Sequence, residues 1–204
     1  MNYLAHLYLA QPNADSHFGN LLGDFGGTRH VRNMPLTVKK ALDNHYLVDK
    51  FTDNHAAIKD AKRYFSQQRK RFAGIAIDVV FDHFLIQHWA QFNHEPLADF
   101  KQNSYQLLNK RVPDMPSRMQ QVISNMTKND WFKEYETITG IGIALDNIAK
   151  RIRFTNNFYG AIEDIQCHYN ELELLFLEFF PQLIDHVNQN AIEGSKVRSI
   201  VRHN

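Results

Sequence analysis

Apolar residues recur at three- and four-residue spacing along almost the whole chain, and this repeat constrains the fold more than any other feature of the sequence. Such spacing places side chains on one face of an α-helix, so each stripe predicts an amphipathic helix. The first two stripes are Leu4, Leu7 and Tyr8, then Phe18, Leu21, Leu22 and Phe25. The alternating β-branched runs typical of half-buried strands are absent. The sequence therefore predicts an all-α fold.

The expected helices follow one another without an internal repeat or a linker. Pro35 opens one that includes Phe51, Asp53 is the expected N-cap of the next, and the most apolar one extends from about Phe72 to Phe92. Later helices are expected within residues 97–137, at 138–154 and at 158–190, where Pro181 breaks or kinks the last one. We predict a single helical domain over residues 1–193 and a polar, basic, frayed tail over residues 194–204.

Composition excludes several classes of protein. The net charge of +1 over 204 residues gives no global field that would indicate a nucleic-acid or membrane-surface partner. No apolar stretch approaches the roughly 20 residues of a spanning helix, and the first residues lack the basic and apolar regions of a signal peptide. The single cysteine, Cys167, excludes an internal disulfide and fits a reducing compartment. These observations predict a cytoplasmic protein that neither binds nucleic acid nor inserts into membranes.

Acidic and imidazole side chains interrupt the most apolar of the expected helices. Asp78 and Asp82 are four residues apart and project from one helical face, and His83 follows Asp82 directly. Their neighbours, such as Val79 and Val80, leave little polar surface on this helix. Because a buried carboxylate is costly unless it is paired, hydrogen-bonded or bound to metal, the segment is a candidate functional site.

Similar polar residues lie earlier in the chain. Asn20 and Asp24 are four residues apart, as are His45 and Asp49, and His6 lies within the apolar first helix. Helical bundles build metal sites from such paired ligands on facing helices. Imidazole and carboxylate ligands without sulfur suit Mn²⁺, Fe²⁺, Zn²⁺ or Mg²⁺. The pattern predicts a site for one or two cations that bind phosphate oxygens and activate a water molecule.

A structural interpretation of the same residues stays open. His45 and Asp49 would then be a solvated pair that stabilises its helix by about 0.2–0.5 kcal/mol. The buried histidines and aspartates would form a hydrogen-bond network within a non-catalytic helical binding module.

Basic residues gather at two places in the chain. One cluster comprises Arg63, Arg69, Lys70 and Arg71, and the other comprises Lys150, Arg151 and Arg153. Either is a solvated helix end that complements the helix dipole or a docking surface for an acidic partner. Neither has the interleaved aromatic residues typical of single-stranded nucleic-acid binding.

Four separated motifs resemble those of the bacterial acyl carrier protein phosphodiesterase family, in order and in spacing. They are Asn2-Tyr3-Leu4-Ala5-His6-Leu7, Gly19-Asn20-Leu21-Leu22-Gly23-Asp24-Phe25, His45-x-x-x-Asp49-x-x-Thr52-Asp53-Asn54 and Asp78-x-x-x-Asp82-His83-Phe84-Leu85-x-x-His88-Trp89. A looser likeness at His168-Tyr169 and Phe179-Phe180-Pro181 extends the resemblance over nearly the full chain. That family in turn resembles the HD-type metal-dependent phosphohydrolases, whose name-giving motif reads His-Asp where this chain has Asp82-His83.

The resemblance implies an HD-phosphohydrolase-like helical bundle that removes 4′-phosphopantetheine from holo-acyl carrier protein, with Mn²⁺ as the expected ion and Mg²⁺, Fe²⁺ or Zn²⁺ as alternatives. We predict one cleft in which Asp78 and His6 have acid/base or supporting roles. The predicted metal ligands are Asp24, His45, Asp49, Asp82 and His83, and the predicted substrate-binding residues are Asn20, His88, Arg63, Arg69, Lys70 and Arg71. The alternatives are a related phosphohydrolase acting on a nucleotide or another small phosphate ester, and the non-catalytic binding module.

Overall fold

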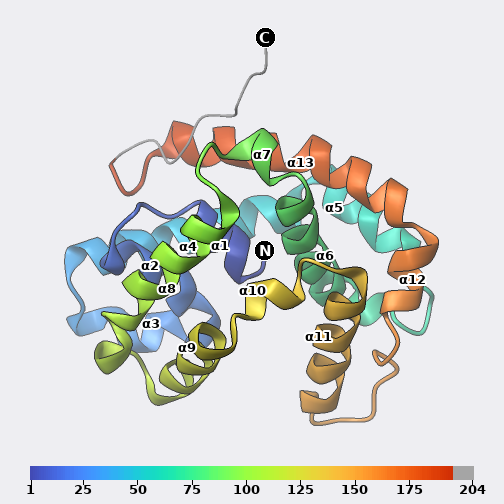
Figure 1. Ribbon diagram of the computed structural model, residues 1–204, viewed down its shortest axis with the longest axis horizontal. Helices are drawn as coiled ribbons and strands as arrows, with labels where there is room; N and C mark the ends of the chain where they lie inside the picture. Colours follow the sequence, from blue (N-terminus) through green and yellow to red (C-terminus); the bar gives the residue numbers. More distant parts are fainter. Residues whose placement is uncertain (195–204) are drawn as a thin grey trace.

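The computed structural model describes residues 1–194, and the regular structure in this part of the chain is helical throughout (Figure 1). The α-helices are α1 (Tyr3–Tyr8), α2 (Ala14–Leu22), α3 (Gly27–His30), α4 (Leu36–Asn54), α5 (Ala56–Ala61), α6 (Ala73–Gln87), α7 (Trp89–Phe92), α8 (Leu97–Asn109), α9 (Ser117–Asn129), α10 (Trp131–Glu134), α11 (Ile138–Arg151), α12 (Ile162–Cys167) and α13 (Tyr169–Asn190). Short 3₁₀ turns join several of them, including η1 (Gly23–Phe25) and η4 (Lys70–Phe72). The all-α prediction is confirmed. The predicted tail, apart from Gly194, lies outside the described residues.

Two predicted helix boundaries are wrong. Asp53 lies inside α4, and α5 is capped instead by His55, whose ring accepts a hydrogen bond from the backbone N–H of Ala57. The helix predicted over residues 158–190 is interrupted at His168, between α12 and α13. It is not interrupted at Pro181, since α13 continues across this proline. Phe180 and Leu183 are buried on either side of it, so packing against the core holds the helix together there.

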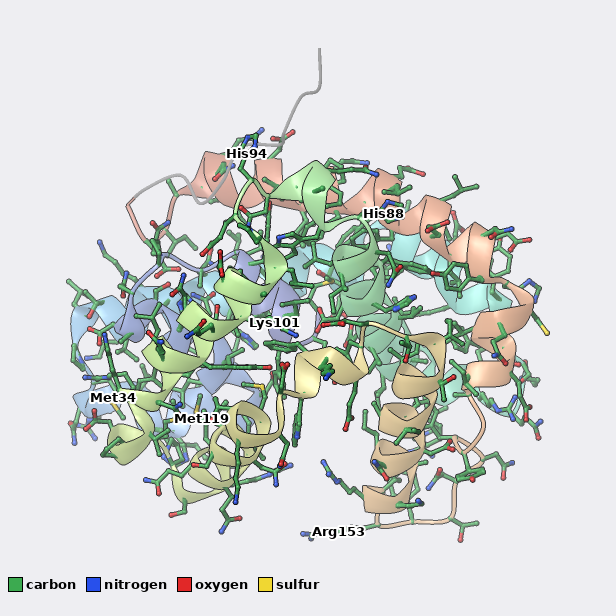
Figure 2. All side chains as sticks on the ribbon, viewed as in Figure 1. Met34, His88, His94, Lys101, Met119 and Arg153 are labelled. Atoms are coloured by element: carbon green, nitrogen blue, oxygen red, sulfur yellow. The ribbon has the colours of Figure 1, made fainter. Side chains whose placement is uncertain are left out.

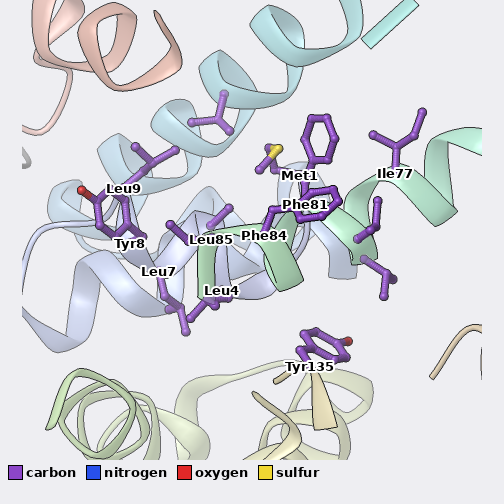
Figure 3. Close-up of a cluster of buried hydrophobic side chains, with 14 of the residues drawn as sticks. Met1, Leu4, Leu7, Tyr8, Leu9, Ile77, Phe81, Phe84, Leu85 and Tyr135 are labelled. Atoms are coloured by element: carbon purple, nitrogen blue, oxygen red, sulfur yellow. The ribbon is translucent and has the colours of Figure 1, made fainter. Parts of the chain in front are cut away.

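The short helix α1 lies in the middle of the molecule (Figure 1). Figure 3 shows its buried side chains, among them Leu4 and Leu7, beside Phe84 and Leu85 of α6. Burying a side chain of this size contributes about 1.5–3 kcal/mol. A helix of only six residues would not be stable by itself in water. The core therefore holds α1 in place, and with it the His6 side chain.

Helices α2 and α4 approach each other closely because glycine lies at their contact. A Cβ atom on Gly19 would be 2.4 Å from the Cβ of Ala41 and 2.5 Å from the carbonyl oxygen of Val38. Four residues later, a Cβ atom on Gly23 would be 2.0 Å from the His45 ring. Only glycine fits at these two positions, because a side chain at either would collide with α4. Gly19 and Gly23 therefore allow α4 to pack closely against α2.

The remaining helices enclose this centre. The long helix α13 packs against α4, α5 and α6, while α9 and α11 lie on either side of α10 (Figure 1). Helix α11 contacts α6, and α9 contacts α8. None of the described helices is long and apolar enough to cross a membrane.

Candidate metal centre

Three side chains from α1 and α4 meet at one point. His6, His45 and Asp49 each offer a ligand atom, and these atoms all lie within 4.8 Å of one another. The Nε2 atoms of His6 and His45 are 3.2 and 3.1 Å from the two carboxylate oxygens of Asp49. The imidazole rings stack with their centroids 4.2 Å apart. Two imidazoles and a carboxylate, without sulfur, form a set of ligands that suits Zn²⁺, Fe²⁺ or Mn²⁺.

His45 is held with its Nε2 atom toward this cluster. Its Nδ1 lies 2.8 Å from the carbonyl oxygen of Asn20, where only an N–H can donate. Metal-binding histidines typically donate their second ring N–H in this way, which fixes the tautomer and the ring orientation. Asn20 is itself fully buried and accepts a hydrogen bond from Asn44. Asn20, predicted to bind substrate, therefore lies where it positions His45 and not where a substrate reaches it.

His6 is the most unusual member of the cluster. It is fully buried, yet neither ring nitrogen makes a hydrogen bond within the described part of the chain, although Nε2 lies close to Asp49. Burial, together with the nearby His45, lowers the pKa of His6 to about 3. The ring is therefore neutral at physiological pH, and the neutral imidazole is the form that binds metal. A buried imidazole without a hydrogen-bond partner fits a site that receives a cation.

The charge of Asp49 is stabilised by the two imidazoles. Burial alone would raise its pKa, but the contacts with His45 and His6 hold the pKa well below its usual range. In return, Asp49 raises the pKa of His45 against the opposing effect of burial. The Asp49 side chain is still 37% exposed, so the cluster is open to solvent on its carboxylate side.

Further charged groups surround the cluster. The α-amino group of Met1 lies 3.2 Å from Asp78 and 3.6 Å from Asp49. Asp24 also acts electrostatically on His45 and on the Met1 amino group. Asp24 is exposed at the surface, but desolvation by the protein around its carboxylate and the charge of Asp49 raise the pKa of Asp24 to about 6. Asp24 and Asp78 thus lie near the cluster, as predicted from sequence, whereas nothing in the sequence pattern indicated the amino group.

The structure does not bring Asp82 and His83 into the same cluster. Both carboxylate oxygens of Asp82 accept backbone N–H groups at the start of α1, at 2.9 Å from Leu4 and 3.0 Å from Ala5. His83 points elsewhere, because consecutive helical residues diverge by roughly 100°. Its ring nitrogens lie 2.7 Å from the carbonyl oxygen of Tyr135 and 2.9 Å from the Tyr169 hydroxyl. Asp82 therefore caps the start of α1, while the Met1 amino group and Asp78 still act electrostatically on it, and its role as a metal ligand stays a prediction. His83 is directed instead to Tyr135 and Tyr169.

Other predicted substrate-binding residues have protein partners. His88 lies beside α13 (Figure 2), with Nε2 2.8 Å from Glu173. Arg69 is largely buried and pairs with Glu163 and Asp164, at 2.8 and 3.3 Å. It therefore ties the turn before α6 to α12 and is not part of an exposed docking surface.

The rest of this basic cluster is more exposed. Arg63 pairs with Asp60 at 2.7 Å, and the guanidinium of Arg71 lies 5.0 Å from the centre of the Phe154 ring. Lys70 is exposed. The docking role predicted for these three residues stays a prediction.

Replacing Gly23 with alanine is expected to displace the His45 ring and to weaken divalent-cation binding at least about tenfold, because overpacking costs about 1–3 kcal/mol. Gly23 has ordinary helical dihedral angles, so the added methyl group acts only through its collision with the imidazole. Titration calorimetry with Mn²⁺ measures the change. Gly74→Ala is the matched control, since its Cβ would meet no atom closer than 3.9 Å. Equal cation affinity in both variants would contradict the placement of His45.

The i, i+4 spacing of Gly19 and Gly23 was the sequence signal for the close packing of α2 against α4, and the sequence analysis did not identify it.

Comparison with known proteins identifies the family of this chain. The family model described as acyl carrier protein phosphodiesterase matches residues 1–183. A protein of that name from Klebsiella pneumoniae (strain 342) is 34% identical over 185 residues, which covers 90% of this chain and 96% of the relative. A protein of the same name from Serratia proteamaculans (strain 568) is 33% identical over 195 residues, which covers 94% of this chain and 100% of the relative. No solved structure matches the chain. The chain belongs to the acyl carrier protein phosphodiesterase family.

Proposed function

We propose that this protein is a divalent-metal-dependent phosphodiesterase that hydrolyses holo-acyl carrier protein to apo-acyl carrier protein and 4′-phosphopantetheine. The observation that carries the proposal is the cluster of His6, His45 and Asp49 in a chain of this family. The relatives' shared name, acyl carrier protein phosphodiesterase, supplies the substrate. An HD-like architecture and a cytoplasmic location stay predictions that accompany this assignment.

His6, His45 and Asp49 are the residues that would hold the ion. When bound, a divalent cation would neutralise phosphate charge and lower the pKa of a water molecule. Mn²⁺ is the ion we propose, because this set of nitrogen and oxygen ligands suits it and the family resemblance implies it. Mg²⁺, Fe²⁺ and Zn²⁺ are the alternatives that metal analysis of the purified protein would distinguish.

Proton transfer falls to the carboxylates beside the cluster. Hydrolysis of the phosphodiester needs a base for the attacking water and an acid for the departing serine alkoxide. Asp24 suits this exchange, because a pKa raised to about 6 leaves both its protonated and ionised forms available near neutral pH. Asp78 is held beside the Met1 amino group and would orient the water or the phosphate.

Incubation of the purified protein with a bacterial holo-acyl carrier protein tests the proposal. Intact-protein mass spectrometry should show loss of 4′-phosphopantetheine in the presence of Mn²⁺ and no loss after chelation with EDTA. A panel of nucleotides and small phosphate esters, assayed for released phosphate, should give no comparable turnover. Turnover of those esters alone would favour the related phosphohydrolase. A folded protein that binds no metal and converts none of these substrates would be the non-catalytic binding module.

A further inference from the structure

A cavity of about 350 Å³ lies between α9, α10 and α11, with the first residues of the chain in its wall. Asn125 and Asn129 line it from α9, Trp131 from α10, and Asn147 and Arg151 from α11. These helices lie on either side of α10 in Figure 1, where the N-terminus is seen next to α10. Of the residues singled out from sequence as basic clusters or candidate ligands, Arg151 is the one in this lining.

The cavity lies next to the metal centre. Asn2 and Tyr3 line it, and they directly follow Met1, whose amino group is 3.6 Å from Asp49. Two residues span at most about 7 Å. The charge of Asp24 adds to burial in raising the pKa of Tyr3 above its usual range. Tyr3 therefore lies between the surroundings of the metal centre and this cavity.

The cavity wall is rich in side-chain amides, each of which both donates and accepts hydrogen bonds. Two of these amides are already held: Asn125 accepts from the Trp131 indole at 2.9 Å, and Asn2 donates to the Tyr135 hydroxyl at 3.2 Å. Asn129 and Asn147 are exposed and have no protein hydrogen-bond partner among the described residues. A wall of this kind can form hydrogen bonds with a neutral, elongated ligand that carries amide groups.

The rest of the lining adds apolar surface and one residue of each charge, Glu134 and Arg151. Ala144 and Ile148 line the cavity between its amides, and the Trp131 ring is half-buried there. The charges around Tyr3 are mixed, because Asp24 acts to raise its pKa whereas Arg118 and Arg151 act to lower it. Neither arginine has an ion-pair partner in the part of the chain that the structure describes. A flexible ligand that carries amides and methyl groups suits these surroundings.

We propose that this cavity binds the pantetheine arm, which carries two amide groups, a hydroxyl and a pair of methyl groups, while its phosphate lies at the metal centre. Asn129 and Asn147 supply free amides for those of the arm, and Ala144, Ile148 and Trp131 contact its methyl groups. This assignment rests on the proposed function, since that reaction separates the arm, with its phosphate, from the serine of the carrier protein. It also explains how an enzyme with a small metal centre selects one phosphodiester from many.

Free pantetheine, which lacks the phosphate, is the probe for this assignment. Titration calorimetry or ligand-observed NMR should detect its binding to the wild-type protein. Asn147→Trp fills the cavity from an exposed position and should weaken that binding at least about tenfold, a loss of about 1.4 kcal/mol. Asn157→Trp is the matched control, because Asn157 is exposed and does not line the cavity. This control should bind pantetheine as the wild type does, and both variants should bind Mn²⁺ unchanged.

Kinetics with holo-acyl carrier protein give a second readout. Asn147→Trp should raise KM at least about tenfold, whereas Asn157→Trp should leave both kcat and KM unchanged. Pantetheine binding that is absent from the wild type, or equal in Asn147→Trp, would overturn the assignment. If Asn147→Trp abolished pantetheine binding while the wild type hydrolysed no carrier protein, the cavity assignment would stand and the proposed function would fall.

Discussion

Replacing Asp49 with asparagine is expected to remove the divalent cation and to lower kcat/KM for holo-acyl carrier protein by more than about a hundredfold. Asp49 is the carboxylate that contacts both imidazoles, at 3.2 Å from His6 and 3.1 Å from His45. The asparagine side chain has the same shape as aspartate but no charge, and its NH₂ group would place a hydrogen-bond donor where the cation would lie. Losing a group that merely orients a metal ligand typically costs 10–100-fold, so losing a ligand costs more.

Metal content by mass spectrometry and steady-state kinetics measure this effect. Asp43→Asn is the matched control, because Asp43 is an exposed residue of the same helix α4. It should keep both the bound metal and full activity. Retention of metal and activity by Asp49→Asn would show that the cation binds elsewhere in the molecule.

The parts of this protein that were predictable from sequence depend on local spacing. Helical periodicity identified the all-α class, and the i, i+4 spacing of His45 and Asp49 placed two members of the metal centre together because one helix carries both. The approach of His6 depends on how the core packs α1 against α6, which no local pattern encodes. The sequence indicated His6 through its apolar neighbours and through the motif Asn2-Tyr3-Leu4-Ala5-His6-Leu7, but not through any spacing to His45 or Asp49.

The contacts that the sequence did not show involve residues whose partners lie far along the chain. A carboxylate within an apolar helix indicates a metal site unless its partner is known, and the partner of Asp82 is backbone 77 and 78 positions away. The same holds for Arg69, whose acidic partners on α12 are 94 and 95 positions later. In both cases the sequence showed an unusual charge but not the distant group that compensates it.

Replacing Asp82 with alanine is expected to lower the free energy of unfolding by about 2–4 kcal/mol, since each buried N–H left without an acceptor costs about 1–3 kcal/mol. Asp82 accepts the N–H groups of Leu4 and Ala5, two of the donors at the start of α1 that have no partner within the helix. The residue before α1, Asn2, provides no side-chain cap of its own. Burial raises the pKa of Asp82 to about 7, so its removal also relieves a desolvation cost, which keeps the expected loss below the sum of two orphaned donors.

Thermal unfolding should show this loss as a melting temperature lower by about 4–16 °C for a chain of this size. Asp82→Asn is the conservative control, because its amide oxygen still accepts one of the two N–H groups. It should be less destabilised and, below its melting temperature, should bind Mn²⁺ as the wild type does, unlike Asp49→Asn. If Asp82 were instead a metal ligand, both Asp82 variants would lose the cation while their melting temperatures stayed near that of the metal-free wild type. The pair of measurements therefore separates a residue that holds α1, and through it His6, from one that binds the ion.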